Sequence, residues 1–230
     1  MTDYGYIERN LTDLMRELEA IAKAAGRKTP KLVCVTKSGT DEELLALAES
    51  GAFAIGENRP GELKRRGELL LERGFTPELH QIGTLQSNKA KLVCDKAALI
   101  HSLDSLSLAR EIDKQGTRLG KKIPVLIEIN SAEEPQKSGV LPDEAEGFLK
   151  EALKFDFISV EGLMTMGPAS EDAEQLRKYF RITKNLFDNL NSRYGFGENP
   201  TLSMGMSDSY KVAIEEGSTL VRVGRRLFKK

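Results

Sequence analysis

The sequence alternates strand-length apolar runs with helix-length amphipathic runs along most of its length. Eight candidate strands follow one another at residues 31–37, 53–56, 79–82, 97–103, 124–129, 157–164, 201–203 and 218–223. Helices are expected at residues 7–26, 40–50, 60–74, 85–93, 105–119, 142–153, 172–194 and 208–216. A closed (β/α)8 barrel requires such alternation, and an open doubly wound parallel sheet is the alternative. We predict an α/β protein, a single (β/α)8 TIM-type barrel over residues 1–230 with an extra N-terminal helix.

The clearest strand ends at a lysine. Residues 32–35 are all apolar, a pattern typical of a strand buried on both faces of a parallel sheet. Thr40 and Glu43 then form a capping-box pattern, so a helix begins directly afterwards. Lys37 is therefore predicted at the carboxyl end of a central strand, where α/β folds place their chemistry. Its amine either extends into water or is kept partly neutral by apolar surroundings, ready to form a Schiff base with an aldehyde.

Composition excludes several classes of partner and site. The 34 basic and 35 acidic residues leave a net charge of −1, which gives no electrostatic reason to expect nucleic acid or an anionic membrane. No apolar run approaches the roughly 20 residues that cross a bilayer, and the first residues lack a signal or transit pattern. Cys34 and Cys94 have no metal-like spacing, so we expect reduced core thiols in a cytoplasmic protein.

Candidate ligand-binding residues gather where the last two strands are predicted to end. In residues 203–207, Gly205 lets the backbone approach a ligand, and Ser207 stands at the expected start of the next helix. Ser207 is then either an ordinary N-cap or a phosphate ligand at a positive helix end. Gly224 follows the last strand and is a second candidate phosphate contact.

Arg222 is the second residue that demands an explanation, because an arginine between buried β-branched neighbours is unusual. It either forms an internal ion pair with Glu128 or Glu161, or is a fixed cation beside a ligand. His80 opens a strand and is expected to be structural. The sequence contains no catalytic triad pattern, metal-spaced cluster or dinucleotide glycine fingerprint.

Taken in order, these loops resemble those of the YggS/PROSC-like pyridoxal 5′-phosphate (PLP) homeostasis proteins. The resemblance covers residues 31–228 and rests on the segments 35–37, 56–58, 80–89, 137–139, 162–166, 203–207 and 217–224. It implies a barrel related to the N-terminal domain of bacterial alanine racemase, without that enzyme's second domain. Arg225 stands where the family often carries a hydroxyl residue, and Arg59-Pro60-Gly61 departs from the family pattern after Asn58.

The resemblance also implies roles for individual residues. Lys37 would form the Schiff base with PLP, Arg222 would lie against the pyridine nitrogen, and Ser203, Ser207 and the amides near Gly224 would hold the phosphate. The complete implied cofactor-binding set is Lys37 (covalent), Asn58, Ser203, Met206, Ser207, Arg222, Gly224 and Arg225.

Two functions remain open at this stage. The first is a PLP-binding protein of intracellular PLP homeostasis, which buffers the cofactor or delivers it to PLP-requiring apo-enzymes. The second is a PLP-dependent amino-acid racemase or related enzyme. Racemisation needs an acid or base on each face of the substrate, and only Tyr210 is available as a partner for Lys37. We favour the binding protein and expect a monomer or weak dimer without a nucleic-acid or membrane partner.

Overall fold

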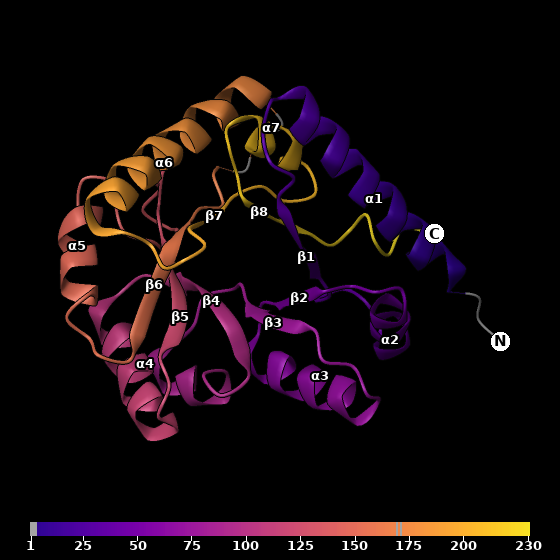
Figure 1. Cartoon of the computed structure of the whole chain (residues 1–230), viewed down its shortest axis with the longest axis horizontal. Coiled ribbons are helices and arrows are strands. Elements are labelled where there is room, and N and C mark those ends of the chain that lie inside the picture. Colours follow the sequence, from indigo (N-terminus) through magenta and orange to yellow (C-terminus); the bar gives the residue numbers. More distant parts are fainter. Residues whose placement is uncertain (1–3, 169, 171) are drawn as a thin grey trace.

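Eight parallel strands close into a barrel in the computed structural model, which describes residues 4–168, 170 and 172–230 (Figure 1). The strands are β1 (Lys31–Val35), β2 (Ala54–Glu57), β3 (Glu78–Gln81), β4 (Ala97–Leu103), β5 (Ile123–Glu128), β6 (Ile158–Met164), β7 (Thr201–Ser203) and β8 (Leu220–Val223). Each strand pairs with the next, and β8 pairs with β1 so that Arg222 lies opposite Val33. The predicted barrel is confirmed, and the open sheet is wrong.

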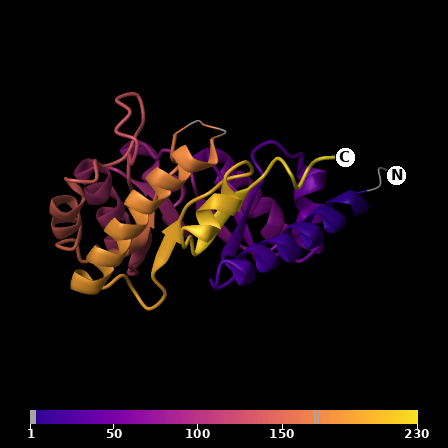
Figure 2. The same ribbon diagram turned by 90° about the horizontal axis from the view of Figure 1, so that it is seen from above.

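Helices surround the barrel (Figures 1 and 2). They are α1 (Gly5–Ala24), α2 (Asp41–Glu49), α3 (Pro60–Glu72), the 3₁₀ helix η1 (Ser87–Leu92), α4 (Leu106–Leu119), α5 (Ala145–Ala152), α6 (Ala173–Tyr194) and α7 (Tyr210–Glu215). Within the described ranges, no helix combines the length and the apolar character needed to cross a bilayer.

The N-terminal helix completes the ring of helices. No helix follows β8 in residues 224–230, and α1 packs against both α2 and α7 in the place that such a helix would take (Figure 1). The C-terminal segment runs beside α1, where the Asn10 side-chain amide donates to the carbonyls of Leu227 (3.1 Å) and Lys229 (2.8 Å). The helix that we expected as an addition is therefore a structural part of the barrel.

The apolar face of α1 covers the seam between β1 and β8. Its buried residues share one face of the helix and are Ile7, Leu11, Leu14, Leu18 and Ala22. They cluster with the outward side chains of the two seam strands, which are Leu32, Cys34, Val221 and Val223. Because successive strand residues point to opposite faces, Val33 and Arg222 point into the barrel instead.

Several predicted elements differ from the structure: the strand expected at 31–37 ends at Val35, and the helix expected at 142–153 begins only at Ala145. The helix expected at 85–93 is the 3₁₀ helix η1, whose i→i+3 bonds include Lys89 N–H to Gln86 O at 2.8 Å. This tight turn buries Ala90 in the short connection between β3 and β4. The helix expected at 208–216 begins only at Tyr210. The strand expected at 218–223 begins at Leu220, and the single proton of the Ser218 hydroxyl lies within hydrogen-bond distance of the carbonyls of residues 202, 204 and 220.

Both cysteines are free and buried, as the sequence predicted. Burial in the apolar core raises the pKa of Cys34 and Cys94 to about 12. Neither thiol is therefore ionised at neutral pH.

We predict that Gly162→Ala destabilises the barrel by about 2–4 kcal/mol. Gly162 has φ +148° on β6, and a Cβ there would lie 2.0 Å from the carbonyl oxygen of Thr201 on β7. Urea denaturation measures the change in the free energy of unfolding. Gly147→Ala is the control, since Gly147 is exposed on α5 with no atom near its Cβ position. It should be neutral or stabilising by up to about 1 kcal/mol, and equal effects of the two changes would contradict the argument.

Candidate functional site

A cavity of about 370 Å³ opens at the carboxyl ends of the strands. Seven of the eight strands contribute to its lining, six of them through the segments that follow them and β5 through its last residue, Glu128. The lining includes Lys37, Asn58, Thr84, Glu128, Met166, Met206, Ser207, Asp208, Arg222, Gly224 and Arg225. A volume of this size suits a small molecule or cofactor. Seven of the eight residues in the predicted cofactor set therefore meet in one cavity.

Lys37 lies in the turn two residues after β1 and lines the cavity. Its side chain is exposed, so the expectation that apolar surroundings enclose the amine is wrong. The capping box predicted for the following helix is confirmed: Glu43 N–H donates to Thr40 Oγ1 (3.2 Å), and Thr40 N–H donates to Glu43 Oε2 (2.8 Å). Lys37 thus stands on a short turn between two anchored elements.

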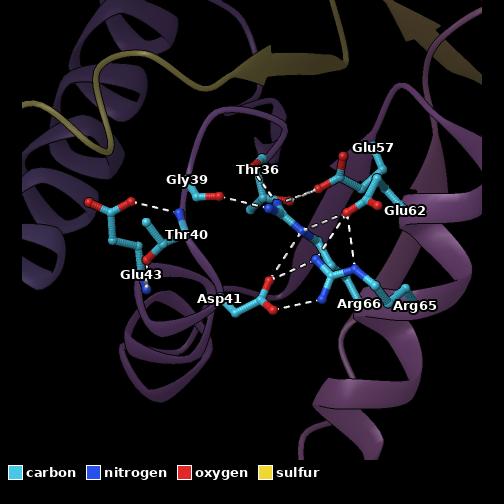
Figure 3. A network of polar contacts seen from close by, with 9 residues as sticks. All are labelled: Thr36, Gly39, Thr40, Asp41, Glu43, Glu57, Glu62, Arg65 and Arg66. Atoms are coloured by element: carbon cyan, nitrogen blue, oxygen red, sulfur yellow. Dashed lines mark hydrogen bonds and ion pairs between the residues drawn. The ribbon is translucent and has the colours of Figure 1, made fainter.

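A buried ion pair holds this turn from below (Figure 3). Arg66 on α3 donates to Glu57 Oε1 and to Gly39 O, both at 2.7 Å, and to the carbonyl of Thr36. The Thr36 hydroxyl also donates to Glu57 Oε1 at 2.6 Å. The carbonyls on both sides of Lys37 are therefore fixed by one guanidinium group, whereas the lysine side chain itself is exposed.

Sequence reasoning missed Arg66, although a signal was present. Arg66 follows Leu63 by three residues and precedes Leu70 by four, so it occupies the apolar face of α3. It is only 7% exposed. A charged residue on a buried helix face needs a partner, and Glu57, at the end of the preceding strand, is that partner.

Arg222 lies at the inner wall of the cavity and is only 4% exposed. Its guanidinium donates to the carbonyls of Ser203 (3.0 Å) and Thr165 (3.1 Å) and to the Ser203 hydroxyl. Among the described residues it forms no ion pair within 4 Å, so the first of the two alternatives, an internal ion pair with Glu128 or Glu161, is wrong. Backbone carbonyls and a hydroxyl satisfy the guanidinium instead, as a buried cation requires.

Ser207 and Gly224 bring the last two loops together. The Gly224 N–H donates to Ser207 Oγ at 3.4 Å, and a Cβ on Gly224 would lie 2.7 Å from the carbonyl oxygen of Val35. Arg225 forms an ion pair with Asp208 at the rim of the cavity. Ser207 is not the cap of α7, whose N-cap residue is Ser209, and this six-residue helix has little dipole to offer an anion. Any phosphate donors here are loop amides, the Ser207 hydroxyl and the Arg225 guanidinium, and not the end of α7.

Ser203 does not line the cavity, contrary to its predicted phosphate role. It is fully buried on β7, and its hydroxyl lies 3.0 Å from His101 Nδ1 while accepting a hydrogen bond from Arg222. The strand alternation points this side chain into the barrel below the cavity floor. Tyr210 is also remote from the cavity, because its hydroxyl donates to Glu17 on α1 at 2.8 Å.

Glu128 is a cavity residue that sequence reasoning considered only as a partner for Arg222. It ends β5, is 3% exposed, and its Oε2 has no hydrogen-bond partner. Burial, with a smaller contribution from Asp104, raises the pKa of Glu128 to about 7, while the Arg222 charge opposes this shift. The cavity therefore contains a carboxyl group that changes charge near neutral pH.

The described residues that line the cavity do not form a metal site. No cluster of three or more potential metal ligands occurs in the described part of the chain. The donors in the cavity are instead an amine, two guanidinium groups and loop amides, a set suited to an organic anion, and the carboxyl groups of Glu128 and Asp208 lie beside them.

Comparison with known proteins places this fold and cavity in a family. The sequence profile described as "Alanine racemase, N-terminal domain" matches residues 10–230. The pyridoxal phosphate homeostasis protein of Aquifex aeolicus is 40% identical over 220 residues, covering 94% of this chain and 95% of that protein. The chain belongs to the pyridoxal phosphate homeostasis protein family. The resemblance seen in its loops is confirmed.

Solved structures extend the comparison. A structure of PipY from Synechococcus elongatus, determined with PLP bound, is 26% identical and has a TM-score of 0.84, covering 97% of this chain and 100% of PipY. Alanine racemase from Corynebacterium glutamicum is 20% identical with a TM-score of 0.75, and covers 98% of this chain and 61% of the racemase. The second likeness concerns the barrel fold alone.

We predict that Glu128→Gln stabilises the protein above neutral pH. Between the ordinary pKa of 4.5 and the folded value of about 7, the folded chain retains a proton that the unfolded chain has lost. The free energy of unfolding therefore falls as pH rises through this window, by at most about 3 kcal/mol. Glutamine carries no charge and avoids this loss.

Urea denaturation at about pH 5 and about pH 8 checks the prediction. The variant and the wild type should be similar at the lower pH, and the variant should be more stable at the higher pH. Glu72→Gln, at an exposed position of α3, is the matched control and should show no such divergence. Parallel pH profiles for wild type and Glu128→Gln would refute the argument.

Proposed function

We propose that this protein binds PLP in the cavity at the mouth of the barrel and acts in PLP homeostasis by buffering or delivering the cofactor. The observation that carries the proposal is the meeting of Lys37, Arg222 and the Ser207–Gly224 loop pair in one cavity of about 370 Å³. The PLP-bound structure of a relative with the same fold supports this assignment.

The residues present fit the chemical groups of PLP. The loop amides at Gly224, the Ser207 hydroxyl and the Arg225 guanidinium suit the phosphate dianion. Arg222 is the buried cation available to the ring nitrogen, and Asn58 and Met206 line the same space. We leave Ser203 out of the phosphate set because its hydroxyl is bonded inside the barrel.

Lys37 is the residue proposed for covalent attachment. Its Nζ would hold PLP through a C–N bond to the aldehyde carbon, with the aldehyde oxygen released as water. The Arg66 clamp fixes the backbone on both sides of Lys37, while the side chain itself is exposed. An accessible attachment point supports reversible loading and release, as buffering or delivery requires.

PLP supplies an aldehyde that captures amines and a ring that accepts electrons when its nitrogen is protonated. A permanent guanidinium beside that nitrogen disfavours its protonation, because two positive charges repel at short range. Arg222 therefore favours holding the cofactor over carbanion chemistry, which supports the binding protein as the first proposal.

We predict that Lys37→Ala abolishes the covalent adduct. Wild-type protein incubated with PLP should gain a visible absorbance band, and borohydride reduction should fix the cofactor on the peptide containing Lys37, identified by mass spectrometry. Lys89→Ala removes an exposed lysine of η1 outside the cavity and is the matched control. A reducible adduct of unchanged stoichiometry in Lys37→Ala would move the attachment elsewhere, and a wild type that takes up no PLP would overturn the function.

The alternative function is a PLP-dependent amino-acid racemase or related enzyme, and Glu128 is the observation that favours it. β5 lies across the closed eight-stranded barrel from β1, so Glu128 faces the cavity from the side opposite to the Lys37 turn. A carboxyl group whose pKa is about 7 can accept or donate a proton at neutral pH.

Exchange of the α-hydrogen of amino acids with deuterium in the solvent separates the two functions. We predict no exchange above the rate with free PLP for a binding protein, since that protein needs no proton transfer at the α-carbon. Exchange that depends on PLP-loaded protein and is lost in Glu128→Gln would establish the enzyme instead. Retention of the reducible adduct in Glu128→Gln is the control for cofactor binding.

A further inference from the structure

A row of buried polar side chains crosses the interior of the barrel below the cavity. His80 on β3, His101 on β4, Ser203 on β7 and Arg222 on β8 are each at most 4% exposed. His80 Nδ1 lies 2.9 Å from His101 Nε2, and His101 Nδ1 lies 3.0 Å from Ser203 Oγ. With the Arg222 contact to Ser203 Oγ, the four side chains form one continuous hydrogen-bonded chain.

This hydrogen-bond chain reaches the opposite end of the barrel. His80 Nε2 lies 3.2 Å from Glu78 Oε2 at the start of β3, and the same oxygen accepts a hydrogen bond from Lys31 at the start of β1. The Glu78 and Lys31 side chains are 35% and 37% exposed. The chain thus connects a partly solvated ion pair at the amino ends of the strands with the cavity wall at the carboxyl ends.

The two end groups determine the direction of every hydrogen bond between them. A carboxylate only accepts, so His80 Nε2 carries a proton and donates to Glu78. A neutral imidazole then accepts at Nδ1, so His101 Nε2 donates to His80. His101 Nδ1 therefore accepts from the Ser203 hydroxyl, whose oxygen accepts from Arg222, a group that can only donate.

Electrostatics agree with two neutral rings. Burial lowers the pKa of His80, with Glu78 opposing the shift and Lys31 adding to it. Burial also lowers the pKa of His101 well below its ordinary value, and the charges of Arg222 and Lys31 act in the same direction. A charged ring would donate at both nitrogens and reverse a bond in the chain.

We propose that His80, His101 and Ser203 are positioning residues, which hold Arg222 in the cavity wall through a one-directional hydrogen-bond chain from its guanidinium to the Glu78 carboxylate. Arg222 has no ion-pair partner within 4 Å among the described residues, so the aligned O–H and N–H dipoles of the chain help to compensate its charge. That Arg222 contacts the ring nitrogen of PLP rests on the proposed function, whereas the chain itself does not.

Nitrogen NMR of the histidine rings tests the hydrogen-bond chain directly, because the protein has only two histidines and both belong to it. Two-bond ¹H–¹⁵N correlation spectra of the labelled full-length protein distinguish the Nε2–H tautomer, the Nδ1–H tautomer and the charged ring. Both rings should be Nε2–H tautomers, unchanged between about pH 6 and pH 8. Assignment needs only one folded variant, His80→Asn or His101→Asn. A neutral Nδ1–H ring or a charged ring at neutral pH would overturn the proposal.

A second measurement tests whether the chain positions Arg222 for the ligand. Ser203→Ala breaks the chain next to Arg222, and it should weaken PLP binding about tenfold and shift the absorbance maximum of the bound cofactor. Ser218→Ala is the matched control, since Ser218 is a buried serine between β7 and β8 whose hydroxyl bonds only to backbone groups. It should change affinity less than about twofold and leave the maximum unchanged.

The outcomes separate this proposal from the proposed function. If the wild type does not bind PLP, the proposed function fails, and the NMR spectra alone decide whether the hydrogen-bond chain exists. If the wild type binds PLP and Ser203→Ala matches it in affinity and absorbance maximum, the positioning role is refuted.

Discussion

The pairing of β8 with β1 is the constraint on which the rest of this structure depends. Closure places Arg222 opposite Val33, and Val33 precedes Lys37 by four residues. Lys37 and Arg222 therefore meet at the cavity although they are far apart in the sequence. In an open sheet of the same strand order they would lie at opposite edges. The apolar face of α1 covers this seam, so the N-terminal helix stabilises the junction at which the site forms.

Two buried arginines give the site its rigid parts in different ways. Arg66 has a carboxylate partner, Glu57, and its two terminal nitrogens also fix the carbonyls of the turn that carries Lys37. Its Nε has no hydrogen-bond partner and lies 3.7 Å from Asp41 and 3.6 Å from Glu62. Arg222 has no such partner and is satisfied by carbonyls and the Ser203 hydroxyl. Burying a charge is costly unless it is paired or hydrogen-bonded. The outcome is a fixed framework around one exposed lysine, an arrangement suited to binding and release.

Much of the fold could be predicted from the sequence, because helix and strand periodicities are local properties. Apolar runs predicted all eight strands, and the Thr40–Glu43 capping box marked the start of α2. The errors occurred where tertiary contacts override local pattern. The Ser218 hydroxyl faces three backbone carbonyls just before β8 begins, and η1 tightens into a 3₁₀ helix in a short connection.

The sequence by itself determined the order of the elements, the place of Lys37 after the first strand and the loop motifs that mark the family. Only the tertiary structure decided that Lys37 is exposed, that Ser203 faces the barrel interior, and that Glu128 is buried with an unpartnered oxygen. Burial and hydrogen-bond partners depend on residues that are distant in the chain and meet only when the barrel closes. Local pattern therefore identifies candidate residues, and packing determines what each of them contacts.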